Sequence, residues 1–194
     1  IFDIQERFDD AGAHFRTGAT GKVLWKLPSL IYSKQGKFQG PGRGLSLNID
    51  PRCQGSESWA AGAGVKGIYD TKGRKISDKN PACNMGIYWD GDFSSEILDG
   101  TSVSKWDWKK EKSNLIFDAK DFQCESNNGT KKNPSLVADL FGDWREELIY
   151  RTSDNQELRI FSSTIPTKHR LYTMMHNPQY RLSIVWQNVG YNQP

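Results

Sequence analysis

The sequence predicts an all-β fold, and three observations indicate it. Its 194 residues include 18 Gly, 7 Trp, 7 Tyr and 9 Phe, and this use of turn-forming and aromatic residues favours strands over helices. Long amphipathic runs are few. Carboxylate-rich turns followed by short apolar runs recur with a period of about 40 to 50 residues. Such repeats are typical of a β-propeller with one four-stranded blade per repeat, and a solenoid is the weaker alternative.

The amino-terminal region predicts a β-hairpin. Residues 14–16 and 22–25 are short runs of strand-forming residues on either side of the glycine-rich turn 17–21. Residues 28–44 then change to Pro, Ser, Lys, Gln and Gly, which indicates a long loop. Arg43 stands between two glycines at its end, where it either faces a ligand or belongs to a solvated turn.

Three carboxylate turns define the repeat. The first runs from Asn48 to Trp59, the second from Asp90 to Leu98 and the third from Asp139 to Ile149. The first is followed by a predicted hairpin over 67–76, and the third by predicted strands at 158–161 and 169–172 around Pro166.

These repeats predict about three complete blades, near 45–76, 84–119 and 136–172, with partial blades at both ends. The final stretch, 180–194, is expected to end at a transition from strand to loop. Because propellers close on themselves from four or more blades, residues 1–194 are interpreted as a single segment of a larger propeller.

The third turn has the composition of a calcium site. Asp139, Asp143, Glu146 and Glu147 lie close together, with Gly142 at the bend, and several oxygen ligands suit a hard cation. The apolar run 148–150 is expected to leave the turn as a strand. Most such sites in repeat folds brace the turn that carries them, so a structural role is the expectation for any one of them.

A polar loop precedes this turn and is expected to face a ligand. Asn128, Gly129 and Thr130 offer a flexible backbone with amide and hydroxyl groups, and they also match an N-glycosylation acceptor. Lys131 follows them. Together with Arg43 it would attract a polyanionic sugar chain, and a lysine with a lowered pKa can act as a base.

Two histidines and one aromatic stretch are further candidates for a ligand-binding role, and each also has a purely structural interpretation. His169 and His176 would each contribute to a cleft or serve as satisfied structural residues. The stretch 105–112 alternates aromatic and charged residues, which predicts a half-buried strand entering a solvated loop. The sharper interpretation makes one of its Trp residues a stacking platform for a sugar.

Bulk properties exclude several classes of protein. A net charge of +3 with interspersed signs is too mild for a nucleic-acid binder. The mean hydropathy is −0.70 and no run approaches a membrane span, so we expect neither nucleic-acid nor membrane partners. Cys53, Cys83 and Cys124 are widely spaced, which indicates neither a zinc site nor a full disulfide framework. At most one pair could form.

Several motifs, taken in order, resemble polysaccharide lyase family eleven, the rhamnogalacturonan lyases. They are TGKVLW, GRG followed by NIDPR and GSESWA, GIYWDGD, NNGTK, ADLFGDWREELIYRT, LRIFSSTIPTKHRLYTMMH and YRLSIVWQNVGYNQP. The resemblance covers nearly the whole chain and corresponds to the carboxy-terminal portion of the family. It implies about half of an eight-bladed propeller, the missing half being supplied by the full-length chain.

The resemblance also implies an activity. The family binds calcium and cleaves the rhamnose–galacturonate linkage of the pectic polysaccharide rhamnogalacturonan-I by β-elimination. Carried onto this sequence, Lys131 and Arg43 would be the catalytic pair. The sugar contacts would be Asn128, Gly129, Thr130 and Tyr191. The Ca²⁺ ligands would be Glu6, Asn48, Asp50, Glu57, Asp90, Asp92, Asp139, Asp143 and Glu147.

The resemblance has local departures. Gln5 precedes Glu6 where the family has histidine, Asn48 stands where aspartate is usual, and Pro41 replaces an acid before the GRG motif. The substrate would be an acidic pectic polysaccharide met in an extracellular or periplasmic location. The alternative function is a non-catalytic carbohydrate-binding propeller or an inactive fragment of such a lyase.

Overall fold

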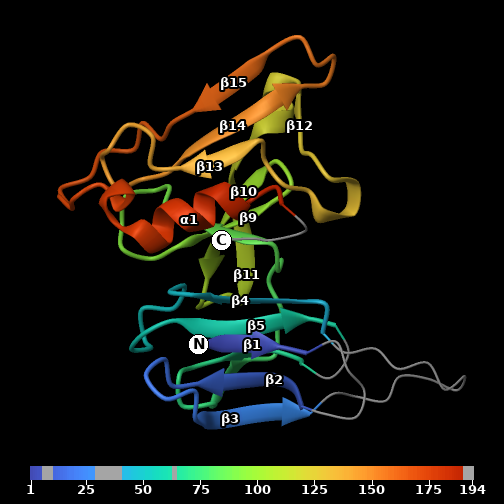
Figure 1. Ribbon diagram of the computed structural model, residues 1–194, viewed down its shortest axis with the longest axis vertical. Helices are drawn as coiled ribbons and strands as arrows, with labels where there is room; N and C mark the ends of the chain where they lie inside the picture. The colour runs from blue at the N-terminus through green and yellow to red at the C-terminus, as the bar shows by residue number, and fades with distance from the viewer. Residues whose placement is uncertain (6–10, 29–40, 63–64, 190–194) are drawn as a thin grey trace, which may run out of the picture. The chain divides into compact units, whose positions relative to one another are not determined.

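The computed structural model describes residues 1–5, 11–28, 41–62 and 65–189. Within these residues the strands form four antiparallel sheets, which confirms the all-β prediction (Figure 1). The chain divides into two compact units, Ile1–Cys83 with Asp107–Lys112, and Asn84–Trp106 with Ser113–Pro194. Cys53, Cys83 and Cys124 are all free thiols.

The first unit holds two sheets. The three-stranded sheet consists of β1 (Phe2–Ile4), β2 (Ala11–Arg16) and β3 (Val23–Pro28). The predicted hairpin is confirmed as β2 and β3, and Phe15 stacks on Trp25 with ring centroids 5.3 Å apart. The second sheet follows chain order, and its strands are β4 (Arg43–Leu47), β5 (Glu57–Ala61), β6 (Ile68–Tyr69) and β7 (Lys75–Ser77).

The second unit holds the other two sheets. One is again in chain order and consists of β8 (Met85–Ile87), β9 (Glu96–Asp99), β10 (Ser102–Asp107) and β11 (Lys112–Asp118), although the tip of its last hairpin is grouped with the first unit. The fourth sheet consists of β12 (Cys124–Glu125), β13 (Leu136–Ala138), β14 (Glu147–Thr152) and β15 (Leu158–Phe161). In it, β14 pairs with β15 along one edge and with β13 and β12 in succession along the other.

Short helices complete the second unit. The 3₁₀ turns are η1 (Ala119–Phe122), η2 (Gly129–Lys131) and η3 (Met174–His176), and α1 spans Pro178–Trp186. In the part of the chain that the structure describes, no helix is long and apolar enough to cross a membrane.

Alternating strand residues build the core of the second unit. Its buried members include Met85, Ile87, Leu98, Val137 and Leu148. Successive side chains on a strand point to opposite faces, so short strands such as β8 can bury every second residue. The core lies between the two sheets of this unit and fixes the turns at their ends.

Tyr150 adds a buried hydrogen bond to this core. Its side chain is 0% exposed, and its hydroxyl donates to the carbonyl oxygen of Gly100 at 2.7 Å. We expect Tyr150→Phe to lower the free energy of unfolding by about 1–2 kcal/mol, because the buried carbonyl loses its partner. Denaturant unfolding measures this loss. Tyr172→Phe, at a side chain that is 89% exposed, is the control and should change stability by less than about 0.5 kcal/mol. Equal effects of both changes would contradict the prediction.

Two predicted strands are wrong. Residues 169–172 are irregular, because the His169 amide donates to Thr167 Oγ1 at 3.1 Å and its carbonyl oxygen accepts from Trp144 Nε1 at 3.4 Å. These side chains occupy the groups that a strand partner would need. The expected strand in 180–194 is replaced, over its described residues, by α1 and the turn that follows. The Asn177 side chain caps α1 by accepting from Gln179 N, and Pro178 occupies its first turn.

The stretch 105–112 behaves as predicted. β10 ends at Asp107, and residues 108–111 form the turn before β11. Trp106 is 5% exposed and belongs to the core, so its ring cannot serve as an open stacking platform. The ring of Trp108 carries the Arg52 guanidinium 4.6 Å from its centroid.

Candidate functional site

The three carboxylate turns share one hydrogen-bond pattern. Each is closed by a buried glutamate at the start of the next strand: Glu57, Glu96 and Glu147. In each, one carboxylate oxygen accepts from two consecutive backbone amides of the turn, at distances between 2.7 and 3.2 Å. A buried amide needs an acceptor, so the repeated glutamate fixes the backbone of all three turns. The glutamate side chains thus brace these turns directly, and the structural role expected of bound calcium stays a prediction.

A basic side chain also contacts the acids of each turn. Arg52 Nη2 lies 2.6 Å from Asp50 Oδ2, and Arg145 Nη2 lies 2.7 Å from Asp143 Oδ2. In the second turn the ammonium of Lys105, on β10, contacts Asp90, Asp92 and Glu96 at 2.9, 2.9 and 2.5 Å. The positive charge comes from within the turn in two cases and from a neighbouring strand in the third.

The acidic groups present fit a hard cation. Asp90, Asp92 and Glu96 each offer a carboxylate oxygen, all within 4.8 Å of one another, and a bound cation would replace the Lys105 ammonium beside them. Glu57 Oε1 and Asp139 Oδ1 are buried and lack a hydrogen-bond partner among the described residues. Buried carboxylate oxygens without partners are costly unless a cation or proton reaches them.

Burial also changes the acidity of these groups. It raises the pKa of Glu96 to about 7, against the opposing hydrogen bond and charge of Lys105. Burial likewise raises the pKa of Glu57 and of Glu147. Glu96 is a candidate cation ligand that was not predicted from the sequence. Its position in the repeat is equivalent to those of Glu57 and Glu147, and this equivalence could have indicated it.

Glu146 joins the second and third turns. Its Oε2 accepts from Tyr88 N at 3.0 Å, and its Oε1 accepts from the Tyr180 hydroxyl at 2.8 Å. That hydroxyl in turn accepts from Asp139 N at 2.8 Å. Burial raises the pKa of Glu146 to about 7, with the charges of Asp139 and Glu147 adding to the shift. The network ties α1 to both turns.

The loop expected to contact sugar is closed by backbone pairing. Asn127 and Asn133 donate to each other's carbonyl oxygens at 2.7 and 3.1 Å. Between them, Asn128, Gly129 and Lys132 have positive φ angles of 59°, 51° and 54°. This tight turn leaves the side chain of Asn128 exposed, together with Gly129 and Thr130, while Lys131 is half-buried.

The segment after α1 holds this loop and the free edge of β13. Gln187 is 1% exposed. Its Oε1 accepts from Val137 N at 2.8 Å, its Nε2 donates to the carbonyl oxygen of Val137, and its own carbonyl oxygen accepts from Asn133 Nδ2 at 2.5 Å. Asn188 Oδ1 accepts from Asn128 Nδ2 at 3.1 Å. The side-chain amide of Gln187 therefore replaces a missing strand partner. No pattern in the sequence indicated these contacts of Gln187 and Asn188, because their partners lie about fifty positions away in the chain.

Arg43 and Lys131 occupy similar places in their own sheets. Arg43 is the first residue of β4 and is half-buried. Lys131 ends the 3₁₀ turn that precedes β13. Arg43 thus begins, and Lys131 precedes, a strand whose other end leads into a carboxylate turn. Asn48, which follows β4, lies in the turn that Glu57 closes.

Some predicted residues lie elsewhere. Glu6 and Tyr191 fall outside the described residues. The ring of His169 lies against Phe93 with centroids 3.9 Å apart, and His176 Nδ1 is 2.7 Å from the carbonyl oxygen of Thr173. Both histidines are exposed. His169 lines a pocket, as its cleft alternative predicted, whereas His176 has a local partner, in keeping with its structural alternative.

Comparison with known proteins decides the family. The family model described as "Rhamnogalacturonan lyase family 11, C-terminal domain" matches residues 1–194. The chain belongs to this family. Relatives from Bacillus subtilis (strain 168) include the rhamnogalacturonan endolyase YesW, 48% identical over 198 residues, and the rhamnogalacturonan exolyase YesX, 44% identical over 199. The matches cover 100% and 94% of this chain but only 29% and 31% of the relatives.

Solved structures of family members agree with the fold. The crystal structure of YesW matches the whole chain with a TM-score of 0.87 at 45% identity. The rhamnogalacturonan lyase PL11 of Bacillus licheniformis matches it with a TM-score of 0.87 at 42% identity. In each case this chain covers 31% of the solved chain. The resemblance inferred from the motifs is thus confirmed.

Proposed function

We propose that the intact protein is a calcium-dependent lyase that cleaves the rhamnose–galacturonate linkage of rhamnogalacturonan-I by β-elimination. The observation that carries the proposal is the match to the lyase family over residues 1–194, with 48% identity to a rhamnogalacturonan endolyase. We further propose that the four sheets are successive blades of a propeller. The acidic pectic polysaccharide would be met outside the cytoplasm, in an extracellular or periplasmic location.

The strand ends support this assignment of roles. Arg43 begins β4, and Lys131 lies in the turn between β12 and β13. Both β4 and β13 lead into a carboxylate turn, so the two basic side chains have similar positions in their own sheets.

The proposed chemistry follows from these two side chains. The Arg43 guanidinium pairs with the galacturonate carboxylate, and neutralising that charge makes the neighbouring C5–H more acidic. The amine of Lys131 acts as the base that takes the C5 proton. The electron pair of the C5–H bond forms the C4–C5 double bond as the C4–O bond breaks, and the leaving oxygen acquires a proton. The polar groups of Asn128, Gly129, Thr130 and Tyr191 orient the sugar.

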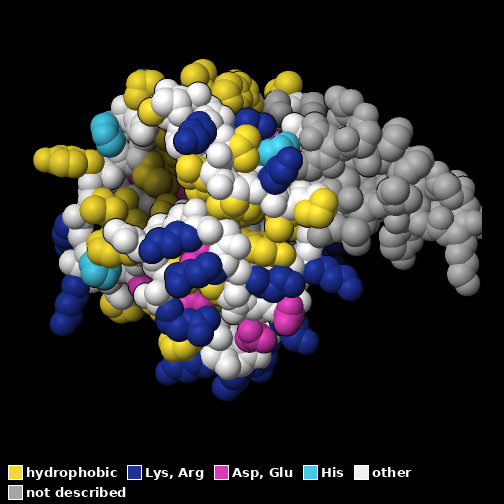
Figure 2. Space-filling view, turned by 90° about the horizontal axis from the view of Figure 1, so that it is seen from below, with side chains coloured by type: hydrophobic (Ala, Val, Ile, Leu, Met, Phe, Trp, Pro, Cys, Tyr) yellow, Lys and Arg dark blue, Asp and Glu magenta, His cyan; other side chains and the backbone are white. Residues whose placement is uncertain are grey.

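Surface charge contributes little to this proposal. Figure 2 shows one face on which Lys and Arg side chains lie with Asp and Glu side chains among them, in keeping with the small net charge of +3. Recognition of an acidic sugar would therefore depend on the individual side chains of Arg43 and Lys131.

Calcium would be held by the carboxylate turns. Their ligands would be Asp50 and Glu57 with Asn48, then Asp90, Asp92 and Glu96, then Asp139, Asp143 and Glu147, and Glu6 from the amino-terminal region. When bound, the cation supplies positive charge that offsets buried carboxylates and stabilises an adjacent galacturonate carboxylate. The turns themselves keep the strands in register by capping their backbone amides.

Removing calcium is expected to abolish product formation by the intact protein. The unsaturated product of β-elimination absorbs ultraviolet light, so absorbance on rhamnogalacturonan-I follows turnover directly. A chelator should suppress the absorbance change, and excess Ca²⁺ should restore it, since bound cations brace the turns. Activity that survives the chelator would contradict the calcium dependence.

A non-catalytic sugar-binding protein is the rival function. It would bind rhamnogalacturonan-I without producing ultraviolet absorbance in the presence of Ca²⁺. That result from the intact protein would exclude the lyase and favour the rival.

A further inference from the structure

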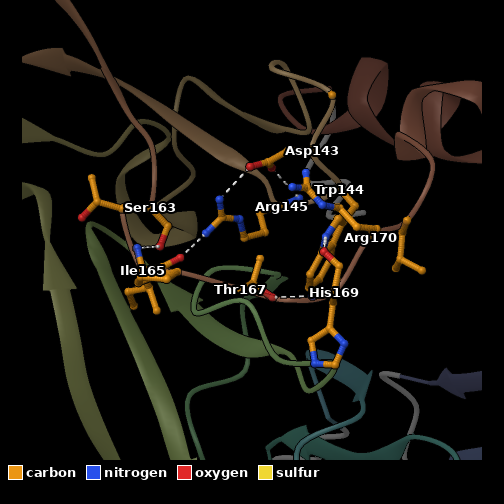
Figure 3. A pocket seen from close by; sticks show the side chains of 12 residues that line it. Asp143, Trp144, Arg145, Ser163, Ile165, Thr167, His169 and Arg170 are labelled. Carbon is orange, nitrogen blue, oxygen red and sulfur yellow. Dashed lines mark hydrogen bonds and ion pairs between the residues drawn. The ribbon is translucent and has the colours of Figure 1, made fainter.

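The second unit contains a pocket that none of the proposed catalytic residues lines. Its volume is about 410 Å³, within the range of small-molecule sites. The carboxylate turn at 142–145 forms one wall, and the segment 163–171 forms the other (Figure 3). Asp143, Arg145 and Arg170 line it together with Ser163, Ile165 and Thr167.

The pocket has a net positive charge. Arg145 and Arg170 provide two guanidinium groups, and Asp143 provides one carboxylate. Asp143 is paired with Arg145 through Nη2 and Oδ2, so the Arg170 guanidinium is the charge that remains for a ligand.

The Arg145 guanidinium is held in place by two hydrogen bonds and has a further N–H group without a partner among the described residues. Its Nη1 donates to the carbonyl oxygen of Ile165 and its Nη2 to Asp143 Oδ2, both at 2.7 Å. Its Nε is buried and has no hydrogen-bond partner among the described residues. Buried donors are almost always satisfied, and a carboxylate is the preferred acceptor for a guanidinium.

The rest of the lining suits a sugar ring. Ser163 and Thr164 supply hydroxyl groups, whereas Ile165 and Leu171 supply apolar surface at 43% and 53% exposure. The Thr167 hydroxyl is held by the Gly91 carbonyl oxygen and the His169 amide and shapes the wall instead. A hexuronate presents the same combination of a carboxylate, hydroxyl groups and apolar C–H faces. The floor of the pocket is well packed, because the buried Trp144 ring lies against Phe93 with ring centroids 5.7 Å apart.

The pocket lies at the other end of β13 from the proposed catalytic loop. Lys131 precedes β13, whereas the turn that carries Asp143 follows it. We propose that this pocket is a second saccharide-binding site, which takes a galacturonate unit of the acidic polysaccharide through Arg145 and Arg170. The identity of the sugar rests on the proposed function. Such a site would retain the polymer chain near the catalytic loop without taking part in bond cleavage.

Two small glycosides test the proposal on the intact protein. Methyl galacturonoside and methyl galactoside differ in the carboxylate, and neither has a linkage to eliminate. The indole N–H of Trp144, assigned with Trp144→Phe, reports binding by NMR from the pocket floor. We expect the galacturonoside to shift this signal and the galactoside to bind roughly tenfold more weakly, because a charge-assisted hydrogen bond is lost.

Arg170→Gln should weaken galacturonoside binding roughly tenfold, for the same reason. Arg170 is exposed, so the change should leave the fold intact. Arg181→Gln is the matched control, because it removes the same charge from an exposed position on α1. It should leave the titration unchanged. Equal affinity in all three proteins, or equal binding of the two glycosides, would overturn the proposal.

The outcome is separable from the proposed activity. A protein that cleaves rhamnogalacturonan-I but shows no Arg170-dependent shift would refute the second site alone. Arg170-dependent binding without cleavage would refute the lyase activity and retain the site.

Discussion

Lys131→Ala in the intact protein is expected to lower kcat on rhamnogalacturonan-I by about 10²- to 10⁴-fold, the usual loss when a general base is removed. The residue ends a turn that is fixed by the Asn127–Asn133 pairing, so removing its side chain should leave the loop in place. KM should change less than kcat, because Asn128, Gly129 and Thr130 remain to bind the sugar. Ultraviolet absorbance of the unsaturated product measures both constants.

Lys120→Ala is the control for this change. Lys120 is exposed in η1 and lies outside the loop, so its loss removes the same charge without touching the proposed base. Its kcat should match that of the unchanged protein. A Lys131→Ala protein with comparable turnover would show that the base assignment is wrong, and folding checked by circular dichroism would exclude a structural cause.

Gln187→Ala is expected to lower the free energy of unfolding by about 2–5 kcal/mol, as estimated from two buried backbone groups that lose their partners. Gln187 satisfies both the amide and the carbonyl of Val137 on the free edge of β13. Alanine offers neither a donor nor an acceptor, and a buried site 1% exposed admits little water. Denaturant unfolding of the intact protein measures the loss.

Gln179→Ala provides the matched comparison. Its side chain is exposed on the first turn of α1, and only its backbone amide takes part in the cap. The change should alter stability by less than about 0.5 kcal/mol. If the two variants unfold at the same denaturant concentration, Gln187 does not support β13 as inferred.

Local pattern was enough to predict the elements built from neighbouring residues. The hairpin at β2 and β3, the hairpin at β6 and β7 and the strand β14 all follow from turn residues between short apolar runs. The carboxylate turns were likewise visible as a repeat. Their hydrogen bonds connect residues six to eight positions apart, so the sequence contains both partners.

The same local reasoning failed where distant groups compete for the backbone. Residues 169–172 have strand-like composition, but Trp144 and Thr167 take the hydrogen bonds of His169. The run after Pro178 has apolar residues that suit a strand, yet the Asn177 cap begins α1 there. In this region only Asn177 and Pro178 could have indicated the helix from the sequence, because such residues are typical of a helix start.

The sequence by itself therefore determined the all-β class, the repeated acidic turns and the membership of a lyase family. These depend on composition, short-range hydrogen bonds and motif order. Tertiary structure alone decided that Gln187 completes β13, that Lys105 joins the second acidic turn and that Arg145 and Arg170 share a pocket with Asp143. Each of these requires side chains from separate strands or turns to meet, and such meetings depend on how the sheets pack.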